Sequence, residues 1–502
     1  MDVVYYDITR LLARHSAPTP TGIDRVDIRY ANHYLQQKVE QRFVYQKNAT
    51  FYYLSKKKSS KLINLLYDKW ITNNAREQNE HVLSNIYNTT IGNKENTKIQ
   101  SKKIQYIQKI TPSLTKGQFN AVDGYLMDIL VKDRDKKSYY INTSHHGVGH
   151  ADAYYVFKTL GKLRIIFYLH DIIPIDYPEY VRIGDDKNHE KRVSAMANFS
   201  DAILVNSNYT KNRFLSFCDK KQYRHPPVHI SYIGVEDSFV RLLQKSNTSE
   251  TGIKISKNYF VTVSTIEPRK NHLMLLQIWR EMIEHKVENI PQLIILGKRG
   301  WNVDNVLDFL ERSPSLKSYV IELSGVSDKQ LVDILRNAKG MLFPSFVEGW
   351  GMPLVEALAM KIPVICSDIE AFRESGQMLA KYISPIDAKC WQNEIIKISN
   401  NSDYRNGLIK KIDSFKLPTW DECFRKLDEF ISQIEEKNFY QAPINTAAFK
   451  VAHQINLKND FDANKDSSFQ KKIKKFKRDP QKFFLDSKIW ILRYVGKKLE
   501  KY

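Results

Sequence analysis

The sequence contains few cysteines and no long apolar run. Four cysteines occur among 502 residues, and no two of them form a C-x-x-C pair, which argues against a disulfide framework and against a zinc site. About 18 consecutive apolar residues, as a membrane-spanning helix requires, occur nowhere, and the N-terminus lacks the apolar core of a signal peptide. These absences predict a protein of the reducing cytosol.

Acidic residues are also scarce relative to basic ones. The chain holds 56 Asp and Glu against 77 Lys and Arg, which gives a formal net charge of +21. Hydrophobic residues at 42% and aromatic residues at 12% exclude wholesale disorder. A chain of this length is expected to form two or three domains. Its charge predicts an anionic partner, which is nucleic acid, an acidic membrane surface or a phosphorylated substrate.

Short β-rich runs alternate with amphipathic or loop segments along the chain. Residues 165–169 and 293–296 are continuous apolar runs, as expected for strands buried on both faces of a parallel sheet. This βαβ alternation occurs twice and predicts an α/β protein with two Rossmann-like domains. The expected strands are residues 3–8, 42–46, 139–143, 163–169, 202–206, 228–233, 259–263, 293–296, 319–323, 341–343, 364–366 and 381–383.

Changes in composition suggest the domain boundaries. A polar, turn-rich stretch near residues 244–258 separates a first domain, 1–245, from a second, 256–418. A Lys/Asn-rich, mostly helical insertion is expected at about 51–120 of the first domain, and a closing helix at 419–437. Residues 438–468 look like a linker. The tail 469–502 holds twelve Lys and Arg against three acids, with aromatic residues interleaved, and is expected to be a basic amphipathic segment.

Residues 341–368, MLFPSFVEGWGMPLVEALAMKIPVICSD, carry the most chemical information. An expected strand ends at residue 343, a glycine-containing turn follows, and Pro353 is well placed to begin a helix. Free N–H groups and the positive dipole end at such a helix start suit a phosphate. Glu348 and Glu356 flank the turn, and each can accept hydrogen bonds from sugar or ribose hydroxyls.

This segment resembles the E-x7-E region of the retaining, two-domain GT-B glycosyltransferases of the glycogen-synthase-like family, glycosyltransferase family 4. Five other segments are similar to motifs of that family in the same order: TPTGIDRVDIRYA (19–31), LHDIIP (169–174), STIEPRKNHLMLL (264–276), LGKRGW (296–301) and LSGVSDKQLVDILRNA (323–338). The resemblance covers roughly residues 1–50 and 125–435. It implies that two Rossmann-like domains face each other across a cleft.

The resemblance also implies catalytic roles in a site for a nucleotide-diphosphate sugar. Lys270, with Arg269 beside it, would neutralise the diphosphate as the sugar leaves. Glu348 would contact donor-sugar hydroxyls near the reacting carbon, and His170 would hydrogen-bond the sugar from the opposite side. The product would keep the donor's anomeric configuration, with the departing phosphate taking the acceptor's proton. Neither a cofactor nor a metal ion is expected.

Further residues are expected to bind the donor on the same basis. Glu356 would hold the ribose, and Gly22 would let backbone N–H groups close over the diphosphate. Many relatives have an arginine where this chain has Ser264, and Arg269 or Arg25 would take its place. The remaining expected donor-binding residues are Gly297, Lys298, Val326, Gly349, Gly351, Met352, Pro353 and Leu354.

Two other groups of residues contain side chains that can bind metal ions. His145, His146 and His150 lie close together, but no cysteine or carboxylate accompanies them at ligand spacing, so substrate contact or an ordinary loop is favoured. Asp-x-Asp occurs at residues 133–135 and 460–462, in charged loop or linker sequence rather than after buried strands. Neither group is therefore predicted to bind a metal ion.

The leading hypothesis is a bacterial transferase that moves a sugar, mannose or a similar one, to a growing capsule or O-antigen polysaccharide. The acceptor would be lipid-linked or polysaccharide, and the tail would hold the enzyme on an anionic membrane. The protein would be cytoplasmic and peripheral on the inner face of the bacterial cytoplasmic membrane, with no nucleic-acid partner. Two alternatives remain open: a transferase acting on nucleic acid or protein, and a catalytically silent assembly scaffold.

Overall fold

The computed structural model describes residues 1–47, 50–72, 126–149, 153–154, 157–158, 161–236, 239, 256–326 and 328–436. The expectations for the linker 438–468, the tail 469–502, His150 and residues 460–462 lie outside the described residues. Most of the expected insertion lies outside them as well.

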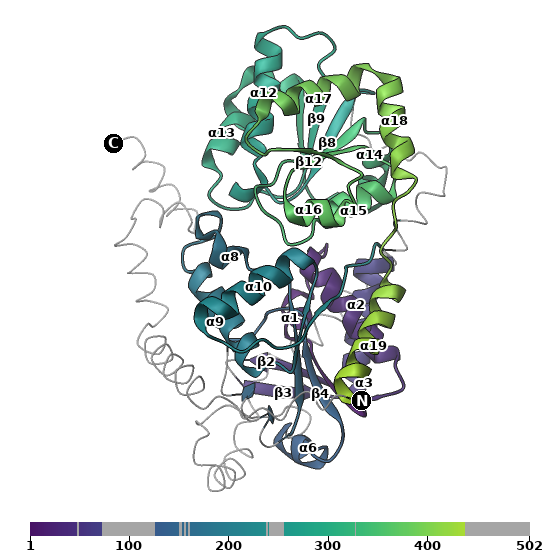
Figure 1. The fold of residues 1–502 in the computed structure, drawn as a ribbon. Coiled ribbons are helices and arrows are strands. Elements are labelled where there is room, and N and C mark those ends of the chain that lie inside the picture. Colours follow the sequence, from purple (N-terminus) through teal and green to yellow (C-terminus); the bar gives the residue numbers. More distant parts are fainter. Residues whose placement is uncertain are drawn as a thin grey trace, which may run out of the picture. The chain divides into compact units, whose positions relative to one another are not determined.

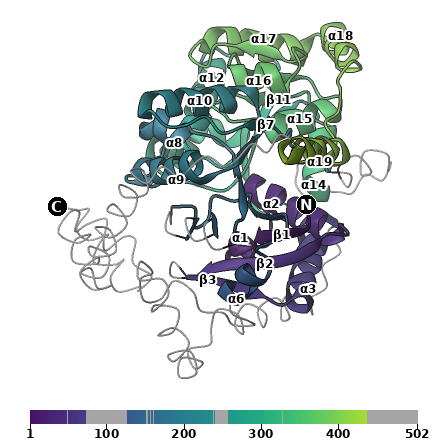
Figure 2. The ribbon, with the colours of Figure 1, turned by 60° about the horizontal axis from the view of Figure 1, so that its bottom comes forward.

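The first half of the chain builds a seven-stranded sheet in the order β3-β2-β1-β4-β5-β6-β7. Neighbouring strands are parallel except for β2 and β3, which pair antiparallel at one edge. Figure 2 shows β1, β2 and β3 side by side. The strands are β1 (Val3–Asp7), β2 (Glu40–Lys47), β3 (Thr50–Leu54), β4 (Ser138–Asn142), β5 (Arg164–Leu169), β6 (Ala202–Val205) and β7 (Val228–Ile230).

The helices of this half follow the strands along the chain (Figure 1). They are α1 (Thr9–Arg14), α2 (Gly22–Gln36), α3 (Lys56–Tyr67), α6 (Leu126–Lys132), α8 (Ile173–Asp176), α9 (Asp185–Phe199) and α10 (Asn208–Lys221). Thr21 caps α2: its hydroxyl accepts from the backbone N–H of Asp24, and the Asp24 carboxylate accepts from the backbone N–H of Thr21 at 2.7 Å. This reciprocal capping box fixes where α2 begins.

The second half builds a six-stranded, fully parallel sheet in the order β10-β9-β8-β11-β12-β13. Its strands are β8 (Tyr259–Val263), β9 (Gln292–Leu296), β10 (Val320–Leu323), β11 (Gly340–Phe343), β12 (Val364–Ser367) and β13 (Lys381–Ile383). Its helices are α12 (His272–Glu284), α13 (Asp304–Arg312), α14 (Asp328–Arg336), α15 (Met352–Ala359), α16 (Glu370–Ser375), α17 (Ala388–Asn400), α18 (Ser402–Ile412) and α19 (Trp420–Glu436).

The prediction of two Rossmann-like sheets is confirmed, and each expected strand is present, with ends that shift by up to three residues. Residues 51–54, placed by the sequence at the start of the insertion, are instead part of β3. They belong to the sheet because Phe51 and Leu54 are buried and the Tyr52 ring stacks on Tyr45 of β2, with ring centroids 5.2 Å apart. The helix expected to begin at Pro353 starts one residue earlier, at Met352.

The last described helix, α19, packs on α2 rather than on the sheet that precedes it in sequence. The Phe424 ring stacks on His33 with ring centroids 4.0 Å apart, and it meets Tyr30 edge-on at 5.1 Å. The Trp420 indole N–H donates to Glu236 at 3.2 Å. Aromatic packing therefore joins α19, at the end of the described residues, to α2 near their beginning.

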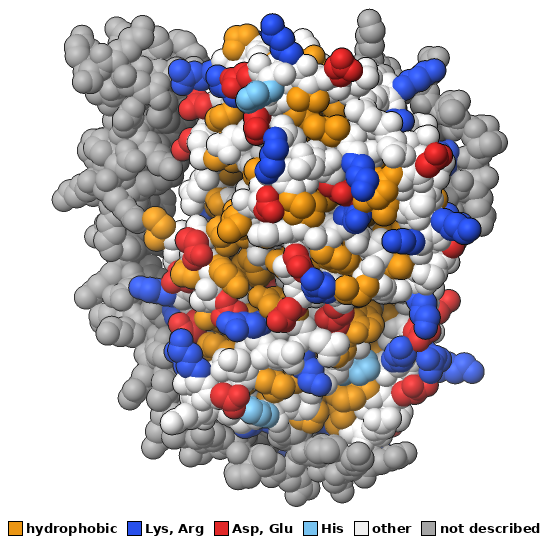
Figure 3. All heavy atoms as spheres, turned by 45° about the horizontal axis from the view of Figure 1, so that its top comes forward, with side chains coloured by type: hydrophobic (Ala, Val, Ile, Leu, Met, Phe, Trp, Pro, Cys, Tyr) orange, Lys and Arg blue, Asp and Glu red, His pale blue; other side chains and the backbone are white. Residues whose placement is uncertain are grey.

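Basic and acidic side chains are interspersed on the face of the described residues shown in Figure 3. Apolar side chains lie between them, and the Lys and Arg residues of this face do not gather into one positive field. Of the helices that the structure describes, none combines the length and the apolar character needed to cross a bilayer.

Candidate functional site

The turn between β11 and α15 is shaped by two glycines that have no room for a side chain. Gly351 has φ +100°, a left-handed conformation, and a Cβ there would come within 2.7 Å of the Phe372 ring. A Cβ on Gly349 would lie 2.6 Å from the His170 carbonyl oxygen. The Ser207 hydroxyl donates to the Gly349 carbonyl at 2.7 Å. The turn is therefore held directly against the loops that follow β5 and β6.

Glu348, in this turn, lies at the centre of a buried ion cluster. One carboxylate oxygen pairs with the Lys270 ammonium, and the other lies 2.6 Å from Arg269 Nη1. Arg269 Nε also contacts Glu267 at 2.7 Å. Because β8 and β11 are neighbours in the sheet, the loops after these two strands meet at the same edge. The structure thus brings together three of the four predicted catalytic residues.

The charges of this cluster depend strongly on one another. Burial raises the pKa of Glu348, but the positive charges of Arg269 and Lys270 outweigh that effect and hold the pKa at about 2. Burial lowers the pKa of Lys270, and the charge of Arg269 lowers it further. Burial also disfavours the charge on Arg269, but Glu348 and Glu267 outweigh it and raise the pKa of that guanidinium. A second anion beside this buried ammonium would stabilise its charged form.

The loops after β8 and β9 touch each other through their backbones. A Cβ on Gly297 would lie 1.8 Å from the Ser264 carbonyl oxygen, so only glycine fits there. The Ile266 N–H donates to the Lys298 carbonyl at 2.9 Å. The Ser264 hydroxyl lies 3.2 Å from His272 Nε2, so the serine is hydrogen-bonded within the loop. These contacts place Gly297 and Lys298 beside the segment that carries Arg269 and Lys270.

Two predicted residues of α2 lie against the start of α15. Arg25 Nη1 is 3.9 Å from a carboxylate oxygen of Glu356. A Cβ on Gly22 would lie 3.1 Å from the Met352 sulfur. Gly22 is the first residue of α2 rather than part of a turn. The structure therefore joins the two halves of the chain at the predicted ribose ligand.

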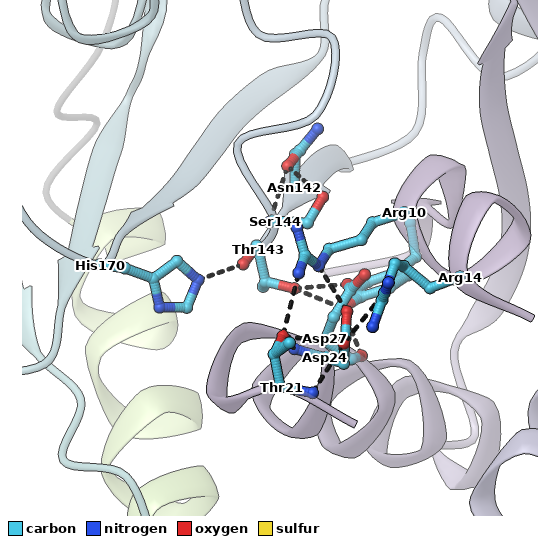
Figure 4. A network of polar contacts seen from close by, with 10 residues as sticks. Arg10, Arg14, Thr21, Asp24, Asp27, Asn142, Thr143, Ser144 and His170 are labelled. Atoms are coloured by element: carbon cyan, nitrogen blue, oxygen red, sulfur yellow. Dashed lines mark hydrogen bonds and ion pairs between the residues drawn. The ribbon is translucent and has the colours of Figure 1, made fainter. Parts of the chain in front are cut away.

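His170 follows β5 and is nearly fully buried, with 5% of its surface exposed. Its Nε2 lies 2.7 Å from the Thr143 carbonyl oxygen (Figure 4). Because a carbonyl only accepts, Nε2 carries the ring proton and Nδ1 presents a lone pair. Burial lowers the pKa of His170 to about 4, so the ring is neutral near pH 7. A neutral ring of this tautomer can accept a hydrogen bond from a hydroxyl.

The remaining predicted residues range from exposed to fully buried. Lys298 is exposed, and Val326 is partly buried against the core. Pro353 and Leu354 form the first turn of α15, with Leu354 fully buried. His145 is a buried residue whose ring packs on His170 and His189, with centroids 5.0 and 5.3 Å away. In the described ranges, no three His, Cys, Asp or Glu side chains are grouped as a metal site.

A buried polar network that the sequence did not predict lies beneath His170. The Thr143 hydroxyl donates to the Asp27 carboxylate at 2.8 Å, and Tyr6 of β1 joins both residues. A signal for Asp27 was present, because it precedes Tyr30, Ala31 and Tyr34 by three, four and seven positions. That spacing places a carboxylate on the buried stripe of α2.

Residues 244–414 match the family described as Glycosyl transferases group 1. The chain is 30% identical over 235 residues to the serotype-specific mannosyltransferase WbdA of Escherichia coli, covering 43% of this chain and 28% of that protein. It is 25% identical over 275 residues to the O-antigen chain mannosyltransferase B of Escherichia coli, covering 52% of this chain and 68% of that protein. The chain thus spans well under half the length of the first of these relatives.

A solved structure shares the arrangement of two Rossmann-like sheets. The structure of Alr3699/HepE from Anabaena in complex with UDP matches with a TM-score of 0.53 and 13% identity. The match covers 86% of this chain and all of that one, at 100%. The fold is therefore of the GT-B kind.

Proposed function

We propose that this chain, whose residues 244–414 match the group 1 glycosyltransferases, is a retaining transferase of family 4 that uses a nucleotide-diphosphate sugar. The observation that carries the proposal is the buried cluster of Glu348, Lys270 and Arg269 at the edge of the second sheet. Two cations are held there at a place where a diphosphate can replace part of their pairing with one carboxylate.

The donor diphosphate binds beside Lys270 and Arg269 and takes over part of their contact with Glu348. The Glu348 carboxylate is then available to accept hydrogen bonds from donor-sugar hydroxyls. Its low pKa keeps it ionised over the whole neutral range, so it acts as an acceptor and not as an acid. The α15 N-terminus, which begins at Met352, adds backbone N–H groups on the phosphate side.

Catalysis in this proposal depends on stabilising the leaving group. As the bond between the anomeric carbon and the phosphate oxygen breaks, negative charge grows on the diphosphate, beside the two cations. The acceptor hydroxyl attacks from the same face, and its proton passes to the departing phosphate oxygen. No side-chain base is required, and the positive charge comes from Lys270 and Arg269, so we propose metal-independent chemistry.

The donor sugar is proposed from the names of the relatives. WbdA and the O-antigen chain enzyme are both mannosyltransferases, so we propose mannose or a similar sugar, transferred to a surface polysaccharide of the capsule or O-antigen type. The solved structure of Alr3699/HepE contains UDP. A donor panel should include uridine-diphosphate sugars, together with the guanosine-diphosphate sugars that the resemblance to family members with an EPRKN segment implies.

A thermal-shift screen of such donors tests the proposal. One donor at 100 times its dissociation constant is expected to stabilise the protein by about 2.7 kcal/mol, and the matching free sugar is expected to give no shift. If no nucleotide sugar raises the melting temperature and none is turned over, the chain is a scaffold and the proposal is wrong.

We further propose that the acceptor is lipid-linked and that the protein works at the inner face of the cytoplasmic membrane. The support is the composition of residues 469–502, in which aromatic residues are interleaved among twelve basic ones. Flotation of the whole chain with anionic and with neutral liposomes tests this membrane attachment. The protein should float with the anionic liposomes, and its absence from that fraction would contradict the proposal.

A further inference from the structure

The buried network beneath His170 joins three elements at the carboxyl ends of neighbouring strands. Tyr6 lies in β1, Asp27 in α2 and Thr143 directly after β4, and all three are fully buried. The Tyr6 hydroxyl donates to an Asp27 carboxylate oxygen at 2.8 Å and lies 2.7 Å from the Thr143 hydroxyl. The Thr143 hydroxyl donates to that same oxygen of Asp27 at 2.8 Å. The side chain of Thr143 thus contacts both Tyr6 and Asp27, and Figure 4 shows its contact with Asp27.

The backbone carbonyl of Thr143 connects this network to His170. The Thr143 carbonyl accepts the Nε2 proton of His170 at 2.7 Å. Asn142 braces the same segment, because its side chain accepts from the Ser144 N–H at 3.0 Å and donates to the His146 carbonyl at 3.0 Å. A carbonyl held in this way selects the tautomer of the ring that it contacts.

The second carboxylate oxygen of Asp27 suggests that the network is not kept for stability alone. That oxygen, Oδ2, is buried, and no described group hydrogen-bonds to it. Burial of a carboxyl with an unsatisfied oxygen costs free energy. A fold that needed only a filled core would favour an apolar side chain here. A half-satisfied buried group is instead common where a site must be held in one geometry.

We propose that Tyr6, Asp27 and Thr143 are positioning residues that hold His170 in its Nε2-protonated tautomer, with the Nδ1 lone pair directed at a hydroxyl of the donor sugar. This inference rests on the proposed function and deepens it. The three residues do not touch substrate and act only through the Thr143 carbonyl.

Neighbouring tyrosines on β1 provide a matched pair of variants. Tyr6 and Tyr5 each donate to a buried aspartate at 2.8 Å, Tyr6 to Asp27 and Tyr5 to Asp133. Successive side chains of a strand point to opposite faces, so only Tyr6 belongs to the network. Tyr6→Phe and Tyr5→Phe should lower the melting temperature by similar amounts. Only Tyr6→Phe should lower kcat, by about tenfold, the usual value of one buried hydrogen bond.

A double-mutant cycle tests whether the effect passes through His170. Thr143→Val should lower kcat by about tenfold, with the donor KM little changed, and Thr143→Ser should restore it. In a His170→Ala background, Thr143→Val should have no further effect. An additive loss in that background, or equal kcat losses for Tyr5→Phe and Tyr6→Phe, would show a merely structural network.

The tautomer itself provides a readout that does not require turnover. In ¹⁵N NMR spectra of the whole protein, the His170 ring should show a protonated Nε2 and an unprotonated Nδ1. In Thr143→Val it should show a mixture of tautomers. An unchanged tautomer in that variant would overturn the inference even if donor transfer is confirmed. A shifted tautomer with no donor binding in the wild type would instead count against the proposed function alone.

Discussion

Lys270→Ala should lower kcat by about 1000-fold while leaving the fold nearly as stable as the wild type. Two unit charges about 4 Å apart at an effective dielectric near 20 interact by about 4 kcal/mol, which corresponds to about three orders of magnitude in rate. The free energy of unfolding should change little, because Glu348 keeps a second cationic partner. Arg269 lies 2.6 Å from Glu348 in the wild-type structure. The variant also no longer has to bury an ammonium group, the burial of which lowers the pKa of Lys270 in the wild type. Steady-state kinetics and thermal denaturation measure the two quantities.

Lys389→Ala is the matched control for this prediction. Lys389 lies on α17, a helix in the same half of the chain as Lys270. Its side chain is 68% exposed and forms an ion pair with Glu281 at 3.8 Å. Removal of such an exposed charge should leave both kcat and the melting temperature near their wild-type values. If Lys270→Ala lowers activity only as far as it lowers stability, Lys270 is a structural residue and the catalytic role is wrong.

Gly349→Ala should lower kcat by about 100-fold or more, which is the usual consequence of moving a catalytic group by about 1 Å. The added methyl group would lie 2.6 Å from the His170 carbonyl oxygen and 3.1 Å from the Asp171 Cβ, so the turn must move away from both. Glu348 is the preceding residue and would move with it. Both the Glu348 carboxylate and the His170 loop would be displaced by one substitution.

Gly407→Ala separates this effect from the general effect of adding a methyl group. Gly407 lies within α18, and no atom comes within 4 Å of a Cβ built there. Replacement of an exposed helical glycine by alanine stabilises a helix by roughly 0.5–1 kcal/mol. Unchanged kcat in Gly349→Ala, together with an unchanged melting temperature, would mean that the turn does not rest on His170.

Both sheets could be predicted from the sequence, because the pattern of apolar residues that marks each strand is local. Apolar runs such as residues 293–296 mark strands buried on both faces, and parallel strands bring the loops after them to one edge. The resemblance to glycosyltransferase family 4 assigned Lys270 and Glu348, which are 78 positions apart, to one site, and the structure places them in contact. The edge strand β3 was missed, because the polar sequence after it resembles an insertion and its pairing to β2 is set by tertiary packing.

The polar contacts that shape the site could not be predicted, because they join distant positions. Tyr6 and Thr143 are 137 positions apart, and nothing near either residue in the sequence indicates their contact. The pairing of Arg25 with Glu356 likewise depends on how α2 and α15 meet. The resemblance implied Arg269 or Arg25 as a substitute for the arginine missing at Ser264, and the structure places Arg25 3.9 Å from Glu356, the expected ribose ligand.

The central claim is that a nucleotide-diphosphate sugar reacts at the Lys270–Glu348 cluster with retention of configuration. The most direct measurement is ¹H NMR of the first product formed from an α-linked donor selected by the thermal-shift screen. The anomeric proton should show an α-linkage in the wild-type product, and Lys270→Ala should form about 1000-fold less of it per unit time. A β-linked first product, or equal product formation by both proteins, would contradict the claim.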